Sequence, residues 1–340
     1  MVCNGLYDNY LRGPLPLEVC RIPNLRHVHL GGNFFSGSIP PHYGRWEHLE
    51  YLAVNGSIPP HYELYVGFYN NFDDGIPPEI GKLRDLFILD MPSCGLSGPI
   101  PSELGNLKHL HTLYLWRNKL SGTIPPELGS LPSLKSMGLS HNDLTGEIAE
   151  EFSKLQKLTL LQLSWNMLHG GIPSFIGDLP NLQFLYLWNN NFTGGIPEQL
   201  GWNGKLREID LSFNELSGLI PLCFGARLEL LRLDYNLLFG TIPGALGNCV
   251  SLIKVIMREN KLKGSIPPEL GNLVSLKHMD LSHNELTGEI PEEFSKLKEL
   301  TVMYLSRSML HGGIPKGLGT LPQLVNISLR YNHLSGRITI

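Results

Sequence analysis

One pattern recurs along most of this chain of 340 residues. Its clearest copy, at positions 131–148, reads LPSLKSMGLSHNDLTGEI, which is LxxLxxLxLxxNxLxGxI, and in most copies Pro follows the final Ile. The Asn recurs at positions 118, 142, 166, 190 and 214, a spacing of 24, and then at 236, 260 and 284, so one unit is two residues short. A unit this small cannot bury its own apolar side chains. Only stacking of successive units produces a continuous hydrophobic core.

Each position of the unit has a physical role. The alternating LxL segment predicts a short strand whose leucines point inward, and stacked strands pair into a parallel sheet on a concave face. The Asn amide can satisfy backbone groups of a turn inside the coil, and the Gly permits a tight bend. Ile-Pro opens the convex segment, where a missing N–H costs little. We therefore predict an α/β solenoid of about 24-residue repeats that forms a single domain over residues 1–340.

The LxGxIP half of the unit resembles the plant-specific class of leucine-rich repeats. That resemblance implies a second sheet and a right-handed superhelix. It covers nearly the whole chain, because Asn9, Asn33, Asn70 and Cys94 hold the Asn position upstream, and Ser308 and Asn332 hold it downstream. We expect the Cys94 thiol to be buried in place of the Asn side chain.

Two irregularities interrupt the array. Asn33 and Asn70 are 37 residues apart where two intact units need 48, so we expect a truncated, irregular repeat at about 52–65, with local distortion of the sheet. Residues 122–185 are echoed at an offset of 142 by residues 264–327, which indicates that a block of repeats was duplicated. Neither end carries a recognisable polar cap, and we find no kinase domain, so we interpret the chain as a piece of something longer.

Composition excludes several functional classes. A net charge of −4 with 17% charged residues leaves no basic surface for nucleic acid. No stretch approaches the roughly 18 apolar residues of a spanning helix, and the start has no signal-peptide features, so we expect no membrane insertion by this chain. Catalytic, phosphate-loop and CxxC motifs are missing from the sequence. We therefore predict no catalytic residue, no cofactor and no metal site.

The cysteines must be interpreted singly, because the five are too scattered for a disulfide-rich domain. Cys223 and Cys249 fall on the convex side of successive repeats, where they could meet. A disulfide between them would imply an oxidising compartment. We treat this pair as a candidate disulfide and leave the free-thiol alternative open.

The outward face of the predicted sheet carries aromatic and charged side chains. Because side chains alternate along a strand, the residues that flank the inward leucines point out of the concave sheet. An exposed aromatic run beside fixed charges is typical of peptide or protein recognition, and the alternative is packing between neighbouring rungs without any ligand. The candidate ligand-binding residues are Tyr114, Trp116, Trp165, Phe184, Tyr186, Trp188, Asp210, Phe213, Arg232, Tyr235, Lys254 and Arg258.

Four stretches resemble the ectodomains of the CLAVATA and BARELY ANY MERISTEM class of receptor-like kinases: GGNFFSGSIPP at 31–41, RWEHLEYLAV at 45–54, GIPPEIG at 75–81 and LYLWNNNFTG at 185–194. The resemblance implies an extracellular or plasma-membrane-associated, glycosylated protein that captures a short peptide and presents it to a co-receptor. Sequons at Asn55, Asn191 and Asn326 are the candidate N-glycosylation sites. We expect the chain itself to be a monomer.

The resemblance also implies an Arg-x-Arg pair on a late strand, which holds the carboxylate at the end of the peptide. Here the aligned residues are Lys254 and Ile256, followed by Arg258. Lys keeps the charge but loses the planar fork, and Ile offers no donor. We therefore expect this interaction to be weakened unless Arg258 reaches across.

Three functions remain open at this point. The leading one is a receptor-like recognition protein that binds a peptide or protein on the concave face. A second is an enzyme inhibitor similar to plant polygalacturonase inhibitors, which use the same repeat. A third is ice binding by a regular Ser/Thr/Asn array, although His169, Phe239, Lys263 and His311 interrupt such an array here.

Overall fold

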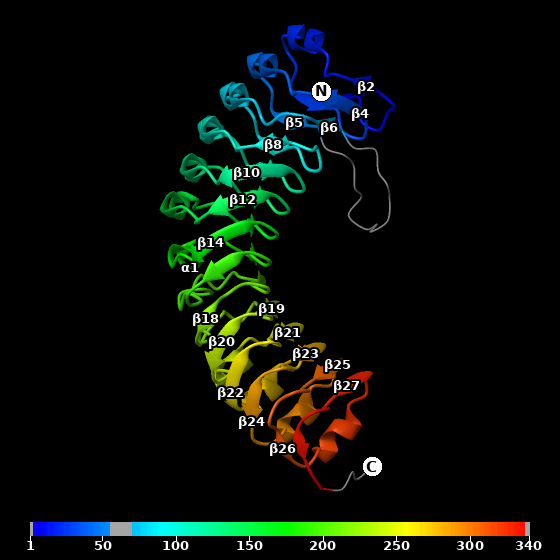
Figure 1. Cartoon of the computed structure of the whole chain (residues 1–340), viewed down its shortest axis with the longest axis vertical. Coiled ribbons are helices and arrows are strands. Elements are labelled where there is room, and N and C mark those ends of the chain that lie inside the picture. Colours follow the sequence, from blue (N-terminus) through cyan, green and yellow to red (C-terminus); the bar gives the residue numbers. More distant parts are fainter. Residues whose placement is uncertain (1–2, 55–69, 337–340) are drawn as a thin grey trace. The chain divides into compact units, whose positions relative to one another are not determined.

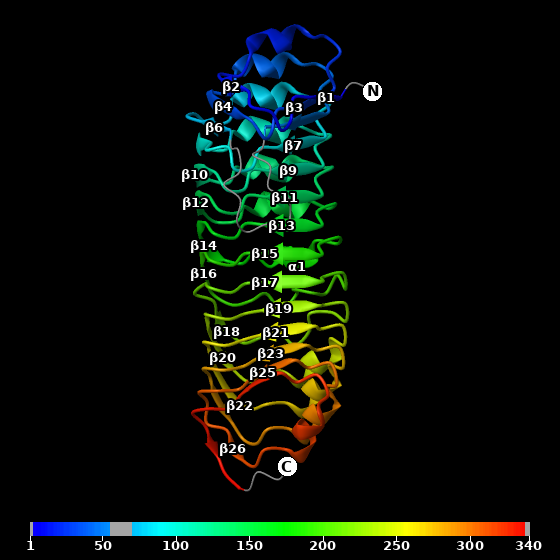
Figure 2. The ribbon, with the colours of Figure 1, turned by 90° about the vertical axis from the view of Figure 1, so that its right-hand side faces the viewer.

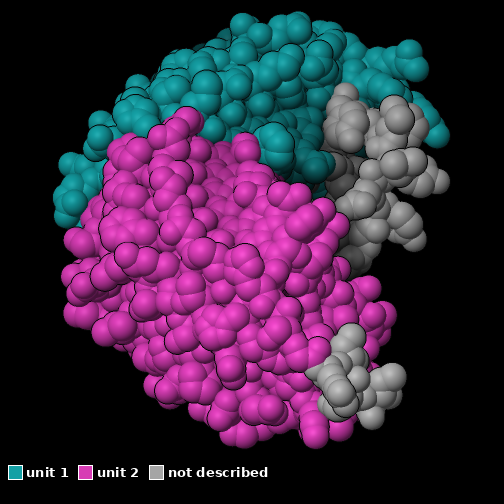
Figure 3. Space-filling model, turned by 60° about the horizontal axis from the view of Figure 1, so that its bottom comes forward, with its two compact units in different colours: residues 1–169 teal, residues 170–340 magenta. Residues whose placement is uncertain are grey.

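The structure is a computed structural model that describes residues 3–54 and 70–336. It divides into two compact units, residues 1–169 and residues 170–340, which are coloured separately in Figure 3. Each unit is a stack of short coils, and each coil contributes one strand to a long parallel sheet and a second, shorter strand to a lateral sheet (Figure 1). This confirms the predicted repeat solenoid.

The long sheet of the first unit is parallel, and neighbouring strands follow the order of the chain. Its register places each residue beside the one 24 positions later, as Ser136 lies beside Leu160, except between the strands at 51–53 and 88–90, where the offset is 37. Its strands are β1 (Cys3–Gly5), β3 (His27–His29), β5 (Tyr51–Ala53), β7 (Ile88–Asp90), β9 (Thr112–Tyr114), β11 (Ser136–Gly138) and β13 (Leu160–Gln162). Figure 2 shows β3 to β13 as one column of strands.

The second unit has an equivalent long sheet with the same chain order. Its register shortens once, from 24 to 22 residues, where Glu208 lies beside Leu230, and the sheet absorbs the short unit without a break. Its strands are β15 (Phe184–Tyr186), β17 (Glu208–Asp210), β19 (Leu230–Arg232), β21 (Lys254–Ile256), β23 (His278–Asp280), β25 (Val302–Tyr304) and β27 (Asn326–Ser328).

The lateral strands begin just after the repeat Asn and form several short parallel sheets, which is the second sheet that the LxGxIP motif implied. In the first unit they are β2 (Arg12–Gly13), β4 (Phe34–Gly37), β6 (Asn71–Phe72), β8 (Ser97–Gly98), β10 (Lys119–Thr123) and β12 (Asp143–Gly146). β14 (Met167–Gly171) pairs with β12 at the end of that unit. In the second they are β16 (Asn191–Thr193), β18 (Ser217–Gly218), β20 (Leu237–Gly240), β22 (Lys261–Ser265), β24 (Glu285–Thr287), β26 (His311–Gly312) and β28 (His333–Leu334).

The side of each coil opposite the long sheet is closed mainly by 3-10 helices rather than α-helices. Pro is often the first residue of these helices, because its missing N–H is not needed there. At the other end, the residue after the helix donates to a carbonyl three positions back, as Leu83 N–H does to Ile80 O. They are η1 (Leu17–Arg21), η2 (Pro41–Arg45), η3 (Pro78–Lys82), η4 (Ser102–Asn106), η5 (Pro126–Ser130), η6 (Glu150–Lys154), η7 (Gly244–Asn248), η8 (Pro268–Asn272), η9 (Glu292–Lys296) and η10 (Lys316–Thr320). Among the described residues only α1 (Phe175–Asp178) is α-helical.

The repeat Asn forms the inner ladder that the sequence predicts. Asn142 is buried; its Oδ1 accepts from the backbone N–H of Leu120 at 3.0 Å, and its Nδ2 donates to the carbonyls of Leu115 and Leu139, both at 3.0 Å. One side chain thus satisfies groups in two neighbouring coils. Cys94 takes the same place, with its buried thiol 3.3 Å from the Val54 and Pro92 carbonyls.

The expected distortion near positions 52–65 has a different form from the one predicted. β5 pairs directly with β7, so that Tyr51 lies beside Ile88. Asn70 accepts from Phe35 N–H at 2.9 Å and donates to Leu30 O at 3.1 Å, which makes it the next rung after Asn33. The 37 residues between these two asparagines are therefore one repeat with an insertion of thirteen residues, not two repeats with a deletion. Residues 55–69 lie outside the described residues.

Candidate functional site

The outward surface of each long sheet, here called the sheet face, is formed by the residues that flank the inward-pointing leucines. The strands end earlier than simple alternation suggests: Trp165, Phe213 and Tyr235 each precede a ladder residue and have positive φ angles of 54°. Left-handed backbone is unusual for aromatic residues, and the ladder hydrogen bonds hold it in place. These three rings therefore project from the turn beyond each strand, not from the strand itself.

In the second unit Arg232 joins two acidic side chains. Its guanidinium lies 3.2 Å from Asp210 on one neighbouring strand and 3.1 Å from Asp234 just after its own strand. Both carboxylates are buried, and burial raises the pKa of Asp210 although Ser212 and Arg232 oppose that rise. Arg232 is thus committed to compensating buried charge and has little capacity for a ligand.

An aromatic pair lies beside this cluster. Phe213 stacks on Tyr235 with ring centroids 4.3 Å apart, and the Arg258 guanidinium lies 5.1 Å from the centre of the Tyr235 ring. Nε of Arg258 is 3.9 Å from the Asp280 carboxylate, which is too long for a hydrogen bond, and it has no acceptor among the described residues. The pair combines a partly exposed apolar surface with a cation, one of whose donors, the buried Nε, lacks a partner within the described part of the chain.

The aromatic residues of β15 lie on the same sheet face. The hydroxyl of Tyr186 donates to the Glu208 carboxylate at 2.6 Å, and burial followed by this contact raises the pKa of Tyr186. The ring of Phe184 lies 5.8 Å from the Arg207 guanidinium. Trp188, just beyond the strand, is half-buried. These contacts, like the stack of Phe213 on Tyr235, join neighbouring coils and support the packing alternative. Phe213 differs in that its side chain remains 40% exposed.

The residues at the positions of the expected Arg-x-Arg pair, Lys254 and Ile256, lie on β21. Ile256 is 7% exposed, so it contributes to packing and not to a polar site. Lys254 is half-buried beside His278, whose pKa is lowered first by burial and then by the charge of Lys254. His278 and Asp280 lie beside Lys254 and Ile256 on the next strand, 24 residues later. The sequence analysis did not include them, although the 24-residue spacing of the repeat identifies their positions.

The first unit holds the remaining predicted residues in its own group. Trp165 is 45% exposed and stacks on His141 with centroids 5.2 Å apart. Tyr114 and Trp116 flank Gly138, where a Cβ atom would lie 2.9 Å from the Tyr114 ring. Glycine thus leaves space for both rings to lie over the sheet.

The candidate disulfide is not formed. Cys223 and Cys249 are free thiols, the former exposed and the latter buried, and burial raises the pKa of Cys249. After burial, the neighbouring Cys223 also raises the pKa of Cys249, so the two thiols influence one another without being bonded. Of the sequons, Asn191 and Asn326 are exposed, whereas Asn55 lies outside the described residues.

The fold and the sheet face define a class of protein: stacked leucine-rich coils that form a long parallel sheet with a broad outward surface. A profile described as "Leucine-rich repeat region" matches residues 42–222, and one for the single "Leucine Rich Repeat" matches residues 24–46, 227–249 and 275–297. The chain therefore belongs to the leucine-rich-repeat family.

The known proteins similar to this chain include plant receptors. A segment of 82 residues, 24% of this chain, is 39% identical to Receptor-like protein 36 of Arabidopsis thaliana and spans 10% of that protein. The ectodomain of the Arabidopsis thaliana receptor kinase GASSHO1/SCHENGEN3, solved with CASPARIAN STRIP INTEGRITY FACTOR 2, is 32% identical over 98% of this chain and 44% of its own, with a TM-score of 0.69. The plant peptide hormone receptor RGFR1, solved with RGF2, is 30% identical over 98% of this chain and 67% of its own, with a TM-score of 0.60.

A plant ice-binding protein is also similar, at 30% identity over 80% of this chain and 84% of its own, with a TM-score of 0.54. The likenesses confirm the predicted resemblance to plant leucine-rich-repeat receptor-like proteins. The chain spans less than half the length of the first receptor ectodomain. No helix in the described part of the chain is both long and apolar enough to cross a membrane.

Proposed function

We propose that this chain is a non-catalytic recognition protein that binds a peptide or protein on its sheet face. The observation that carries the proposal is the stack of Phe213 on Tyr235 with the incompletely paired Arg258 guanidinium against it. Rigid aromatic rings beside a cation are the side chains that most often dominate binding energy at such surfaces. The similar receptors solved with their ligands support this role and an extracellular setting. The similar receptor kinase HAESA, solved with the peptide hormone IDA and the co-receptor SERK1, supports a co-receptor as a further partner.

The ligand contact at β21 is proposed to differ from a pair of arginines. Lys254 and Arg258 carry the positive charge there. Ile256, which lies between them in the sequence, is buried. A peptide with a free terminal carboxylate should therefore bind more tightly than its amidated form. Its affinity should be lower than at a site with two arginine guanidinium groups, because lysine cannot form the paired hydrogen bonds of a planar guanidinium. Comparing free-acid and amidated forms of one peptide tests this contact directly.

The test of the proposed function is calorimetric titration of the purified protein with a panel of plant secreted peptides. We expect saturable binding that Phe213→Ala and Tyr235→Ala each weaken about tenfold or more. Phe239→Ala is the matched control, because Phe239 is similarly exposed but lies on the lateral strand β20. Equal losses in all three variants, or no binding by folded protein, would contradict the proposal.

Trp165 supplies a separate comparison in the first unit. If Trp165→Ala weakens binding as strongly as Tyr235→Ala, the ligand uses both groups of aromatic residues. A similar ice-binding structure favours the ice-binding alternative. Against it, the lateral strands carry Phe239 and Lys263 where a regular hydroxyl array would be needed. Thermal hysteresis in solutions of the protein would support ice binding.

A further inference from the structure

A cavity of about 680 Å³ lies in the first unit, at the ends of η3 and η4 and the turns that follow them. Its volume is in the range of small-molecule sites. Every charged side chain of its lining is basic, although the chain as a whole carries a net charge of −4, so the positive charge is a local feature of two coils. The lining residues are Gly81, Lys82, Arg84, Asn106, Lys108 and His109.

The repeat brings these basic residues together from neighbouring coils. Ile88 of β7 lies beside Thr112 of β9, so residues 24 positions apart hold equivalent places in the two coils. Arg84 and Lys108 are such a pair. Stacking of the coils therefore places a guanidinium and an ammonium group around one cavity.

The Lys108 side chain is held in place without a carboxylate. Its Nζ donates to the carbonyl of Gly105 at 2.7 Å and to the carbonyl of Ser130 at 3.0 Å. An ammonium group has three donors, so a third remains for another acceptor. Carbonyl groups do not neutralise the charge, and Lys108 therefore presents a fixed cation to the cavity.

Lys82 and Arg84 are exposed, and neither forms an ion pair within the described part of the chain. Asp85 follows Arg84 directly, but its carboxylate lies 3.4 Å from Nδ1 of His48. Neither Asp85 nor Glu103 of the next coil contributes to the lining of the cavity. The cations of the cavity are thus not committed to acidic side chains of this chain.

Stacking alone does not produce such a cavity, because the equivalent places in other coils carry different side chains. In the second unit the two neighbouring coils that contain η7 and η8 have only neutral residues there: Asn248, Val250, Asn272 and Val274. The basic lining therefore depends on the particular residues of the first unit.

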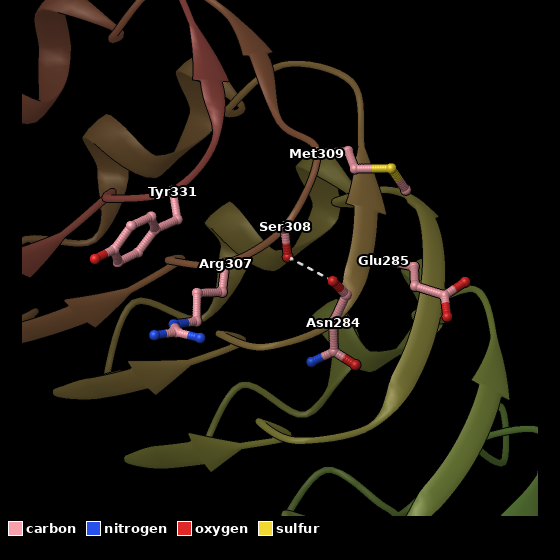
Figure 4. Close-up of a pocket in the computed structure, with 6 residues that line it drawn as sticks. All are labelled: Asn284, Glu285, Arg307, Ser308, Met309 and Tyr331. Atoms are coloured by element: carbon pink, nitrogen blue, oxygen red, sulfur yellow. Dashed lines mark hydrogen bonds between the residues drawn. The ribbon is translucent and has the colours of Figure 1, made fainter.

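A depression of about 380 Å³ in the second unit gives a second contrast (Figure 4). Arg307 and Tyr331 lie on one side of Ser308, and Glu285 lies on the other. The Arg307 guanidinium is 4.9 Å from the centre of the Tyr331 ring. Because an acidic and a basic side chain line this depression together, it does not favour ligands of one sign of charge, as the cavity of the first unit does.

We propose that the basic cavity of the first unit binds the oxyanion group of a phosphate or sulfate ester on a partner molecule. Such a group offers three acceptor oxygens, so it can accept from Lys82, Arg84 and Lys108 together, whereas a carboxylate has only two oxygens. The Asn106 amide lies in the same lining and adds a neutral donor. The cavity lies at the helical side of the coils and not on the sheet face, so the site does not depend on the function proposed above.

The test is a titration of the full chain, labelled with ¹⁵N-lysine, with inorganic phosphate and separately with inorganic sulfate. Ionic strength is kept constant with chloride, at neutral pH. We expect saturable shifts of the Lys82 and Lys108 amide resonances, and acetate should bind more weakly than the better of the two ions. Preference for phosphate or for sulfate identifies which ester the site takes.

Arg84→Gln should weaken binding of the better ion at least about fivefold, because it removes one of three cations. Arg84→Lys should lose less, since it keeps the charge. Lys298→Gln is the matched control: Lys298 is exposed and holds the equivalent place in the coil of η9, where Thr320 and Pro322 of the next coil supply no cation. It should leave the affinity unchanged.

Three results would overturn the proposal. The first is the absence of a saturable shift with either ion in the wild-type chain. The second is equal weakening by Arg84→Gln and Lys298→Gln, which would show general attraction of anions to the surface. The third is acetate binding as tightly as phosphate and sulfate. None of these results depends on whether Phe213 and Tyr235 bind a peptide.

Discussion

The Arg258 guanidinium lies 5.1 Å from the centre of the Tyr235 ring, although the two side chains belong to different coils. Tyr235 has left-handed backbone and projects from the turn after β19, while Arg258 follows β21. The contact therefore joins neighbouring repeats across the sheet face. It brings the Arg258 cation against the aromatic surface of Tyr235 and Phe213.

We expect this pair to show a measurable interaction energy. In a double-mutant cycle of Arg258→Met and Tyr235→Leu, the coupling free energy of unfolding should be about 0.5–1 kcal/mol, as for a partly exposed cation over a ring. Urea unfolding of the four proteins measures it. A coupling energy of zero would show that the two side chains do not interact in solution.

Removing the Arg232 guanidinium should destabilise the second unit strongly. Arg232→Met leaves the buried Asp210 and Asp234 carboxylates without their cation, which should lower the free energy of unfolding by about 3 kcal/mol. Adding Asp234→Asn to that variant should recover part of the loss. Arg207→Met is the control, since its pair with Glu229 is exposed and should contribute about 1 kcal/mol or less.

Gly81 should not tolerate a methyl group. A Cβ atom there would lie 2.3 Å from the carbonyl oxygen of Glu103 in the next coil, so Gly81→Ala should lower stability by about 1–3 kcal/mol through overpacking. Gly319 occupies the corresponding helix position in η10, where a Cβ atom would meet nothing within 4 Å. Thermal unfolding of Gly319→Ala should therefore match the wild type or exceed it slightly.

Asp90 should make stability depend on pH in an unusual direction. Burial raises the pKa of Asp90 from 3.8 to about 6, so between these values the folded chain binds more protons than the unfolded chain. The contribution of Asp90 therefore favours folding at low pH, declines as pH rises from about 4 to about 6, and is constant above that range.

Asp90→Asn removes this decline. The variant should be more stable than the wild type near neutral pH, by as much as about 3 kcal/mol, and similar to it near pH 4. Urea unfolding across this range checks the difference, with Asp143→Asn as an exposed control. A difference between variant and wild type that does not change with pH would contradict the assignment.

Much of the fold follows from local chemistry that the repeat displays directly. Leucine spacing determines which side chains point inward, and an amide at a fixed place in each unit is needed to satisfy backbone groups of the coil, as Asn142 does. Cys94 could be placed by the same reasoning, because position in the unit determines its burial. The candidate site was only partly predictable. Strand alternation identified Phe213 and Arg258 as candidates, but both lie in turns just beyond the strands, and the contacts of their side chains depend on neighbours in other coils.

The sequence by itself determined the repeat, the inward face of each strand and the ladder, because these depend on spacing within one unit. Only the tertiary structure decided that Asn70 follows Asn33 as the next rung, that Arg232 is occupied by two buried carboxylates, and that Cys223 and Cys249 are free thiols. These outcomes depend on which residues stacking brings together and which it buries. Distances between coils are set by the packing of the whole array, and spacing along the chain does not specify them.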